Sequence, residues 1–301
     1  MAQNIWAALS DQLAEVSATV GQSVVAIHGS RHASSGIVFN KETVITASHA
    51  LRRDEDIKVV ISPETSVSAR VAGRDPSTDL ALLRLQQPVT ASAPRWGDTS
   101  KLRVGELVLA LARSWRGNIV ASSGILSGLI NGGWRTWRGG EIGQFIRPDL
   151  VLYRGFSGGP LVNSAGEILG LNTAGLHNSG ITVPASTVAR VATELLEKGH
   201  IERPYLGLGM HAVPLQESLR AKLNLKNSAG LLVVHVEPDG PADQAGFLLG
   251  DVLLELEGKP VTDTREVQDA LRSTKVGSTV QTGVVRAGTV ITIRVKLTAR
   301  P

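Results

Sequence analysis

Residues 154–162 read RGFSGGPLV and place a serine, Ser157, between glycines, with Pro160 close behind. Two unrelated folds use such a stretch. The run from Gly155 to Gly159 matches the Gly-x-Ser-x-Gly elbow of α/β-hydrolases, in which an acid and then a histidine follow the serine. It also matches a nucleophile loop in which a histidine and an aspartate come before the serine. The rest of the chain decides between the two.

The sequence after Ser157 is typical of strands. Gly158 and Gly159 are poor helix formers, and the apolar runs LVN and EILGLN follow on either side of a turn. This pattern predicts a β-hairpin, whereas an elbow requires a long helix. Upstream, His49 follows the apolar run VITAS, and Asp79 precedes LALLRL. The order His49, Asp79, Ser157 therefore argues against the elbow and against an esterase of that fold.

These three residue types suit acyl transfer. A serine hydroxyl is a weak nucleophile at neutral pH and needs a base with a pKa near 7, which the imidazole of His49 provides. A carboxylate such as Asp79 fixes the imidazole tautomer and stabilises the imidazolium. Glycines on both sides of Ser157 let the backbone turn sharply and aim the N–H groups of Gly155 and Ser157 at the developing oxyanion. Losing one such donor costs about 3–4 kcal/mol.

Composition limits the class of protein. The chain has 301 residues, enough for two domains, and its 32 glycines, 4% aromatic content and short apolar runs favour a mostly β fold. The formal charge of +4 is spread along the chain, so we expect no nucleic-acid partner. The absence of cysteine excludes disulfides and thiolate catalysis.

Two modules are predicted along the chain. Apolar residues at helical spacing predict a helix over 4–19, which packs on the domain or makes an oligomer contact. A second helix over 186–198, with Ser186 as its cap and Gly199 as its stop, ends the first module. We expect domains at 1–200 and 203–301, with one short helix in the second. The start lacks signal-peptide features and no apolar run is long enough to span a membrane, so we expect a soluble chain.

Several long motifs in this order resemble those of HtrA/Deg-family serine proteases, and the likeness covers nearly the whole chain. They include SSGIVFNKETVITASHAL, GRDPSTDLALLRL, GFSGGPLVNSAGEILGLNTA and PADQAGFLLGDVLLELEG. The resemblance implies a chymotrypsin-like double β-barrel followed by a β-sandwich-like PDZ domain with short helices. It implies His49 as base, Asp79 as its partner, Ser157 as nucleophile and the backbone of Gly155, Phe156 and Ser157 as oxyanion hole. Where the family usually has Pro-Gly-Asn-Ser, this chain has Arg154-Gly155-Phe156-Ser157, so we expect a bulky aromatic beside the oxyanion hole that can sit in more than one arrangement.

The resemblance also assigns two binding regions. It places Val151 at the base of an apolar specificity pocket, and the predicted substrate-binding residues are Val151, Leu152, Thr173, Ala174, Ile181 and Val183. In the PDZ module, the N–H groups of Leu206, Gly207 and Leu208 are predicted to hold a chain-terminal carboxylate. The peptide is expected to add as a strand beside 208–212, against the helix that bears Val267 and Leu271.

The expected partners are unfolded or damaged proteins as substrates and C-terminal peptides at the PDZ domain. The resemblance further implies a homotrimer in the periplasm or another extracytoplasmic compartment, although a cytoplasmic protein stays compatible with the sequence. We expect no cofactor and no metal, because the six histidines besides His49 show no ligand spacing. The alternative is a catalytically impaired PDZ-containing binding protein or chaperone.

Overall fold

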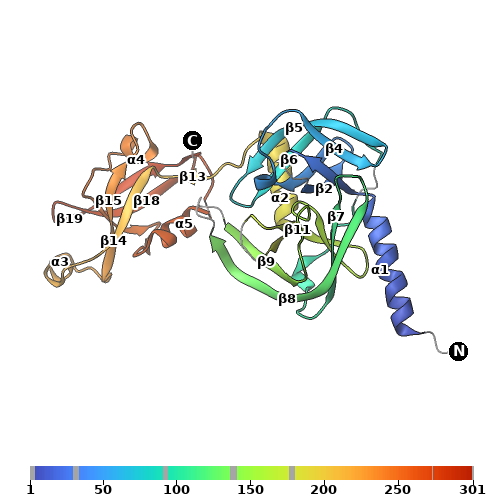
Figure 1. Ribbon diagram of the computed structural model, residues 1–301. Coiled ribbons are helices and arrows are strands. Elements are labelled where there is room, and N and C mark those ends of the chain that lie inside the picture. The colour runs from blue at the N-terminus through green and yellow to red at the C-terminus, as the bar shows by residue number, and fades with distance from the viewer. Residues whose placement is uncertain are drawn as a thin grey trace. The chain divides into compact units, whose positions relative to one another are not determined.

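The computed structural model describes residues 4–29, 34–90, 94–135, 141–175, 180–272 and 274–299. The chain divides into two compact units, residues 1–201 and 202–301 (Figure 1). Strands are the predominant regular structure of both units, and the first contains two closed barrels of six strands each. The predicted mostly β double-barrel fold is therefore confirmed.

The first barrel closes in the strand order β1-β2-β3-β6-β5-β4, with β4 pairing back to β1. Successive side chains of a strand point to opposite faces, so Val25 and Ile27 of β1 fill the interior together with Val44 and Leu83. The strands are β1 (Val24–His28), β2 (Ser34–Asn40), β3 (Thr43–Ala47), β4 (Ile57–Ser62), β5 (Thr65–Asp75) and β6 (Leu80–Leu85).

The second barrel closes in the order β10-β11-β12-β9-β8-β7. Its interior holds Val108, Ala110, Leu126, Ile146 and Leu161. The hairpin predicted after Ser157 is confirmed, since β10 pairs antiparallel with β11. The strands are β7 (Leu107–Arg113), β8 (Ile119–Arg135), β9 (Glu141–Asp149), β10 (Pro160–Asn163), β11 (Ile168–Thr173) and β12 (Ile181–Pro184).

A further apolar cluster joins the two barrels. Ile45 and Leu82 of the first barrel meet Leu111 and Leu171 of the second in this cluster. These residues alternate with the interior ones along their strands, so each barrel buries its outer face against the other. The loops at the ends of β3, β5 and β11 are thereby held by two packed barrels.

The helix predicted at 4–19 is confirmed as α1 (Ile5–Gly21), which begins at an Asn4 cap whose side chain accepts from the N–H of Trp6. Its C-terminal half packs on the barrels, where Val16 and Val20 are buried. Ile5 and Trp6 are each 75% exposed, and the start of the helix extends away from the barrels (Figure 1).

The second predicted helix is confirmed as α2 (Ala185–Lys198), which buries Val188, Val191 and Leu195. It ends at Gly199, whose left-handed φ of 76° is a conformation that glycine adopts without a steric cost. The prediction of Ser186 as its cap is wrong. The helix follows Pro184 without a side-chain cap, because β12 runs directly into it.

The second unit is a sheet in the order β14-β15-β16-β18-β19, with β17 paired to β16 and a separate β13-β20 pair. One helix was expected; besides α5 (Thr264–Arg272), the structure has α3 (Glu217–Leu223) and the single turn α4 (Pro241–Gln244). The strands are β13 (Pro204–Tyr205), β14 (Leu208–Pro214), β15 (Ala229–Val236), β16 (Val252–Leu256), β17 (Lys259–Pro260), β18 (Thr279–Arg286), β19 (Thr289–Lys296) and β20 (Thr298–Ala299).

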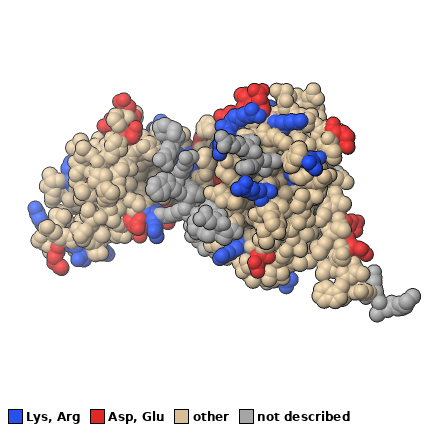
Figure 2. Space-filling view, in the orientation of Figure 1, with Lys and Arg blue, Asp and Glu red and all other residues tan. Residues whose placement is uncertain are grey.

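Basic and acidic side chains are interspersed over the face of the molecule that Figure 2 shows. Among the described residues, no helix combines the length and the apolar character that crossing a membrane requires. The same part of the chain contains no cluster of three or more histidine and acidic side chains suited to a metal ion.

Candidate active site

His49 lies in a single 3-10 turn, η1 (Ser48–Ala50), directly after β3. Asp79 holds this turn at three points. Its carbonyl accepts from the N–H of Ser48 at 2.9 Å, its Oδ1 accepts from the N–H of His49 at 2.8 Å, and its Oδ2 lies 2.6 Å from His49 Nδ1. A carboxylate only accepts, so Nδ1 carries the proton in this pair and Nε2 is left as the basic nitrogen.

The hydrogen bond to Asp79 raises the pKa of His49 above its ordinary value of 6.5, although partial burial acts in the opposite direction. Thr173, at the end of β11, donates its hydroxyl to the same Asp79 Oδ2. The side chains of Asp79 and Thr173 are both buried. The carboxylate is thus oriented by partners from both barrels.

Asp79 lies directly before β6 and has a positive φ of 56°, a conformation that aspartate tolerates better than most residues. The turn before it is built around the buried carboxylate of Asp75. That carboxylate accepts from the N–H of Ser77 at 3.1 Å, from the Ser77 hydroxyl at 2.5 Å and from the Thr78 hydroxyl at 2.8 Å. Asp75 was not among the residues predicted for the site.

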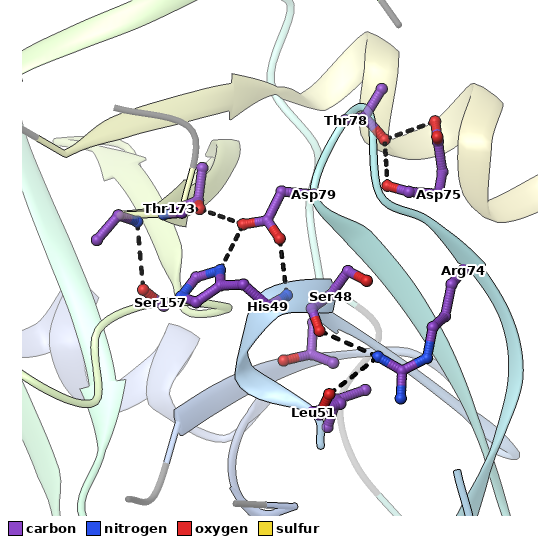
Figure 3. A network of polar contacts seen from close by, with 12 residues as sticks. Ser48, His49, Leu51, Arg74, Asp75, Thr78, Asp79, Ser157 and Thr173 are labelled. Atoms are coloured by element: carbon purple, nitrogen blue, oxygen red, sulfur yellow. Dashed lines mark hydrogen bonds and ion pairs between the residues drawn. The ribbon is translucent and has the colours of Figure 1, made fainter. Parts of the chain in front are cut away.

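Ser157 comes from the second barrel and lies on the opposite side of the His49 ring from Asp79 (Figure 3). Its hydroxyl oxygen accepts from the N–H of Ala174 at 3.3 Å. His49 and Asp79 are 30 positions apart in the sequence, and Asp79 and Ser157 are 78 positions apart. The fold therefore brings three distant residues together between the barrels.

The loop that carries Ser157 is bound to the first barrel through Ser35 of β2. The N–H of Ser35 donates to the Ser157 carbonyl at 2.9 Å, and its hydroxyl donates to the Gly155 carbonyl at 2.7 Å. Gly158 packs so closely that a β-carbon there would lie 1.9 Å from the Ser35 carbonyl oxygen. Its φ of 88° also favours glycine. Ser35 was not among the residues predicted for the site.

Phe156 lies in the predicted oxyanion loop, and its position differs from the prediction. Its side chain is 2% exposed and packs inside the second barrel, with its ring centroid 6.1 Å from that of Tyr153. The expectation of a bulky aromatic beside the oxyanion hole is wrong, because the hydrophobic interior takes up the ring. The N–H of Phe156 donates to the Tyr153 carbonyl at 3.1 Å, so Gly155 and Ser157 are the remaining candidate donors.

The predicted pocket residues lie in different surroundings. Val151 is 55% exposed, and Leu152 is half-buried beside Gly180. Ile181 and Val183 are buried in the cluster between the barrels. Thr173 directs its hydroxyl to Asp79, and Ala174 is exposed and contacts Ser157 through its N–H. Five of the six residues are apolar, and the sixth is Thr173.

The predicted carboxylate loop lies at the start of β14. The carbonyl of Leu206 accepts from Ala242 N–H, and that of Gly207 accepts from Glu237 N–H, both at 2.9 Å. In a trans peptide the N–H points opposite to the carbonyl, so the N–H groups of Gly207 and Leu208 are directed away from these partners.

The helix expected beside a bound peptide is α5. Val267 is 2% exposed and belongs to the core of the second unit, so its side chain is not available to a peptide. Leu271 is half-buried at the edge of the same core. Of the two groove residues that sequence analysis singled out, only Leu271 keeps exposed surface.

Two closed barrels, with a histidine and an aspartate from the first and a serine from the second, define the class of trypsin-like peptidases. The description "Trypsin-like peptidase domain" matches residues 34–171, and "PDZ domain" matches residues 204–297. Among solved structures, the serine endoprotease from Yersinia pestis is 26% identical with a TM-score of 0.75, over 96% of this chain and 98% of that one.

Curated relatives identify the family. The chain is 32% identical to "Serine protease Do-like HtrA" from Bacillus subtilis and to the protein of the same name from Lactobacillus helveticus, in both cases over 87% of this chain. It is 31% identical to "Periplasmic serine endoprotease DegP" from Salmonella typhimurium, again over 87% of its length. The chain belongs to the HtrA family of serine proteases. It spans 63%, 68% and 56% of the lengths of these three relatives, respectively.

Proposed function

We propose that this chain is a serine endopeptidase that hydrolyses peptide bonds of unfolded or damaged proteins. One observation carries the proposal: the His49 ring, bonded to buried Asp79 at 2.6 Å, has Ser157 on its other side (Figure 3). Membership in the HtrA family supports the same reaction.

In this reaction, His49 Nε2 takes the Ser157 hydroxyl proton as Oγ attacks the substrate carbonyl carbon. Asp79 stays ionised, holds the ring and stabilises the imidazolium. When the tetrahedral intermediate collapses, the imidazolium gives its proton to the leaving amine. Water, deprotonated by His49, then hydrolyses the acyl-enzyme and restores Ser157. Thr173 contributes by holding the carboxylate in place.

The N–H groups of Gly155 and Ser157 are proposed to stabilise the oxyanion. Support comes from the Phe156 carbonyl, which accepts from the Gly159 N–H at 3.0 Å. In a trans peptide the N–H points opposite to the carbonyl, so the Ser157 N–H is directed away from this partner. The resemblance assigns Val151, Leu152, Ile181 and Val183 to an apolar specificity pocket, which we propose here. Val151 and Leu152 keep surface that a substrate can contact, and Ile181 and Val183 are buried. Because none of them is charged, a buried lysine or arginine of a substrate would lack a partner there.

The second unit is proposed to bind C-terminal peptides, either to tether substrates or to activate the first. The amides of Gly207 and Leu208, which point away from α4 and β15, support this role. We also propose domain boundaries near residues 200 and 203, consistent with the two compact units.

We propose that the protein forms a homotrimer through its protease domains and acts outside the cytoplasm. The exposed Ile5 and Trp6 of α1 offer an apolar surface for a neighbouring copy. The location is supported by the Salmonella relative, which is named as a periplasmic endoprotease.

The test is digestion of an unfolded protein by the wild type and by Ser157→Ala. Ser157→Ala or His49→Ala should lower turnover by up to about a million-fold, and Asp79→Asn by about ten-thousand-fold, the scales known for other triad proteases. A competing function, a catalytically impaired PDZ binding protein or chaperone, is favoured by the resting contact of the Ser157 hydroxyl with Ala174. Rapid labelling of Ser157 by a fluorophosphonate would exclude it, because only an activated serine reacts quickly.

A further inference from the structure

Arg74 and Asp75, adjacent residues at the end of β5, serve the two neighbouring turns of the site. Side chains of consecutive strand residues point in opposite directions. Asp75 therefore faces the turn of Thr78 and Asp79, while Arg74 reaches the turn that carries His49 (Figure 3). The contacts of Asp75 shape the turn before Asp79. The contacts of Arg74 have no part in the reaction described above.

The side chain of Arg74 makes five hydrogen bonds, and all of them end within residues 48–54. Its Nη1 donates to the carbonyls of Ser48 and Leu51, both at 3.1 Å. Its Nη2 donates to the Arg53 carbonyl at 3.1 Å and to Asp54 Oδ1 at 2.5 Å, and its Nε donates to the same Oδ1 at 3.0 Å. One guanidinium thus binds four residues of the 48–54 segment, which contains His49.

The segment needs such a clamp because it has little regular structure of its own. The turn η1 is three residues long, and so short a helix leaves most of its carbonyls without an internal partner. The turn has one internal hydrogen bond, from the Leu51 N–H to the Ser48 carbonyl at 3.1 Å. Arg74 adds a planar, fixed set of donors, which bind the same Ser48 carbonyl and the carbonyl of Leu51 directly after the turn. The ion pair with Asp54 is a weaker contribution, since the Asp54 side chain is 71% exposed to water.

The chain that follows α2 holds the backbone of Arg74. Arg74 forms a parallel β-bridge with His200. The preceding Gly73 allows this contact, because a β-carbon there would lie 2.4 Å from the Gly199 carbonyl oxygen. The guanidinium therefore projects from a fixed backbone, as a positioning group must.

We propose that Arg74 is a positioning residue, which holds the 48–54 segment so that the N–H and the ring of His49 both meet Asp79. Arg74 contacts neither substrate nor the reacting atoms and acts only through the backbone on either side of His49. The inference rests on the proposed peptidase function for its kinetic consequences, but its effect on His49 is independent of turnover.

The first measurement is steady-state cleavage of a short peptide by the full chain and its variants. Arg74→Ala should lower kcat about 10- to 100-fold with KM changed less than about twofold, because small misplacements of a catalytic group carry costs of this size. Arg74→Lys should fall in between, since an ammonium cannot reach all five acceptors. Arg70→Ala is the matched control: Arg70 is exposed on the same strand and should leave kcat unchanged.

The second measurement is NMR titration of the His49 ring, assigned with His49→Ala. If the clamp holds His49 against Asp79, the His49 pKa in Arg74→Ala should move down toward that of a free imidazole. The pH profile of kcat/KM should shift the same way, which a simple loss of folded protein would not produce.

An unchanged His49 titration in Arg74→Ala overturns the inference whether or not the wild type cleaves peptides. Unchanged kcat in Arg74→Ala, with an active wild type and an inactive Ser157→Ala, overturns it while the peptidase function stands. An equal loss of kcat in Arg70→Ala would likewise overturn it, because the effect would then not depend on the clamp. If Arg74→Ala does not fold, the same two measurements are made on Arg74→Lys.

Discussion

Phe156 anchors the nucleophile loop, and truncating it should damage both stability and catalysis. Its ring is 2% exposed among the apolar side chains of the second barrel, one residue before Ser157. In Phe156→Ala the barrel loses this ring and keeps a cavity, while the loop loses its main contact with the core. Phe156→Leu retains most of the apolar volume and should be milder.

The size of the effect follows from the burial. Replacing a fully buried phenylalanine by alanine costs about 3–5 kcal/mol of unfolding free energy. Domains of ordinary stability have about 5–15 kcal/mol in total, so a large fraction would be lost. With a urea m-value of about 2 kcal/mol/M, the unfolding midpoint of the first unit should fall by about 2 M.

Tryptophan fluorescence can follow this unit selectively. All five tryptophans, at positions 6, 96, 115, 134 and 137, precede residue 201, so the second unit does not contribute to the signal. Urea unfolding of the wild type, Phe156→Ala and Phe156→Leu gives the midpoints. Peptide cleavage is then measured in buffer without urea, where the folded fraction is known, to separate loss of kcat from loss of folded protein.

Phe247→Ala is the matched control. Phe247 is also 2% exposed, but it belongs to the core of the second unit. This variant should leave the fluorescence midpoint and the kcat for a short peptide unchanged. A midpoint for Phe156→Ala within about 0.3 M of the wild type would refute the packing argument. Full kcat per folded molecule in Phe156→Ala would refute the claim that the ring anchors the loop.

Four further predictions concern the site and its regulation. Because Asp79 raises the His49 pKa and only the neutral imidazole accepts a proton, kcat/KM should rise with pH through a midpoint above 6.5; a lower midpoint contradicts this. Gly175→Ala should lower kcat about 100-fold, since its β-carbon would lie 2.4 Å from His49 Nδ1, whereas Gly128→Ala, with no neighbour closer than 3.7 Å, should be silent. Mass spectrometry of digests should find cleavage after valine, isoleucine, leucine or alanine, and dominant cleavage after lysine or arginine would reject the apolar pocket. A peptide with an apolar C-terminal residue should stimulate the full chain about 5- to 150-fold, its amidated form and a 1–201 truncation should show little stimulation, and equal stimulation of both chains would reject regulation through the PDZ domain.

The order of the three site residues and the strands around them could be predicted because both depend on local patterns. Apolar runs bounded by turns mark the strands, and the two glycines after Ser157 exclude a helix there. The same reasoning placed α2 within one residue of its observed start and identified Gly199 as its end. It missed α3 and α4, whose seven and four residues are too short for a convincing helical period.

Contacts across the barrels could not be predicted, because no local period encodes them. The direction of the Phe156 side chain depends on closure of β7 to β12 around it, whereas the sequence alone predicted a ring beside the oxyanion hole in more than one arrangement. Arg74 looked like one of many scattered basic residues. Its role depends on β5 ending beside residues 48–54, which only the barrel pairing brings about.

Ser35 illustrates why the site belongs to neither barrel alone. Its N–H and hydroxyl hold the Ser157 loop, 120 residues away from it, and its carbonyl accepts from Thr46 Oγ1 just before the His49 turn. A shift of one barrel against the other would therefore move the nucleophile relative to its base. The apolar cluster between the barrels resists that shift. Its member Ile45 is adjacent to Thr46 in β3, and its member Leu171 is two residues before Thr173 in β11. The packing of the two barrels against each other therefore also keeps Ser157 aligned with His49 and Asp79.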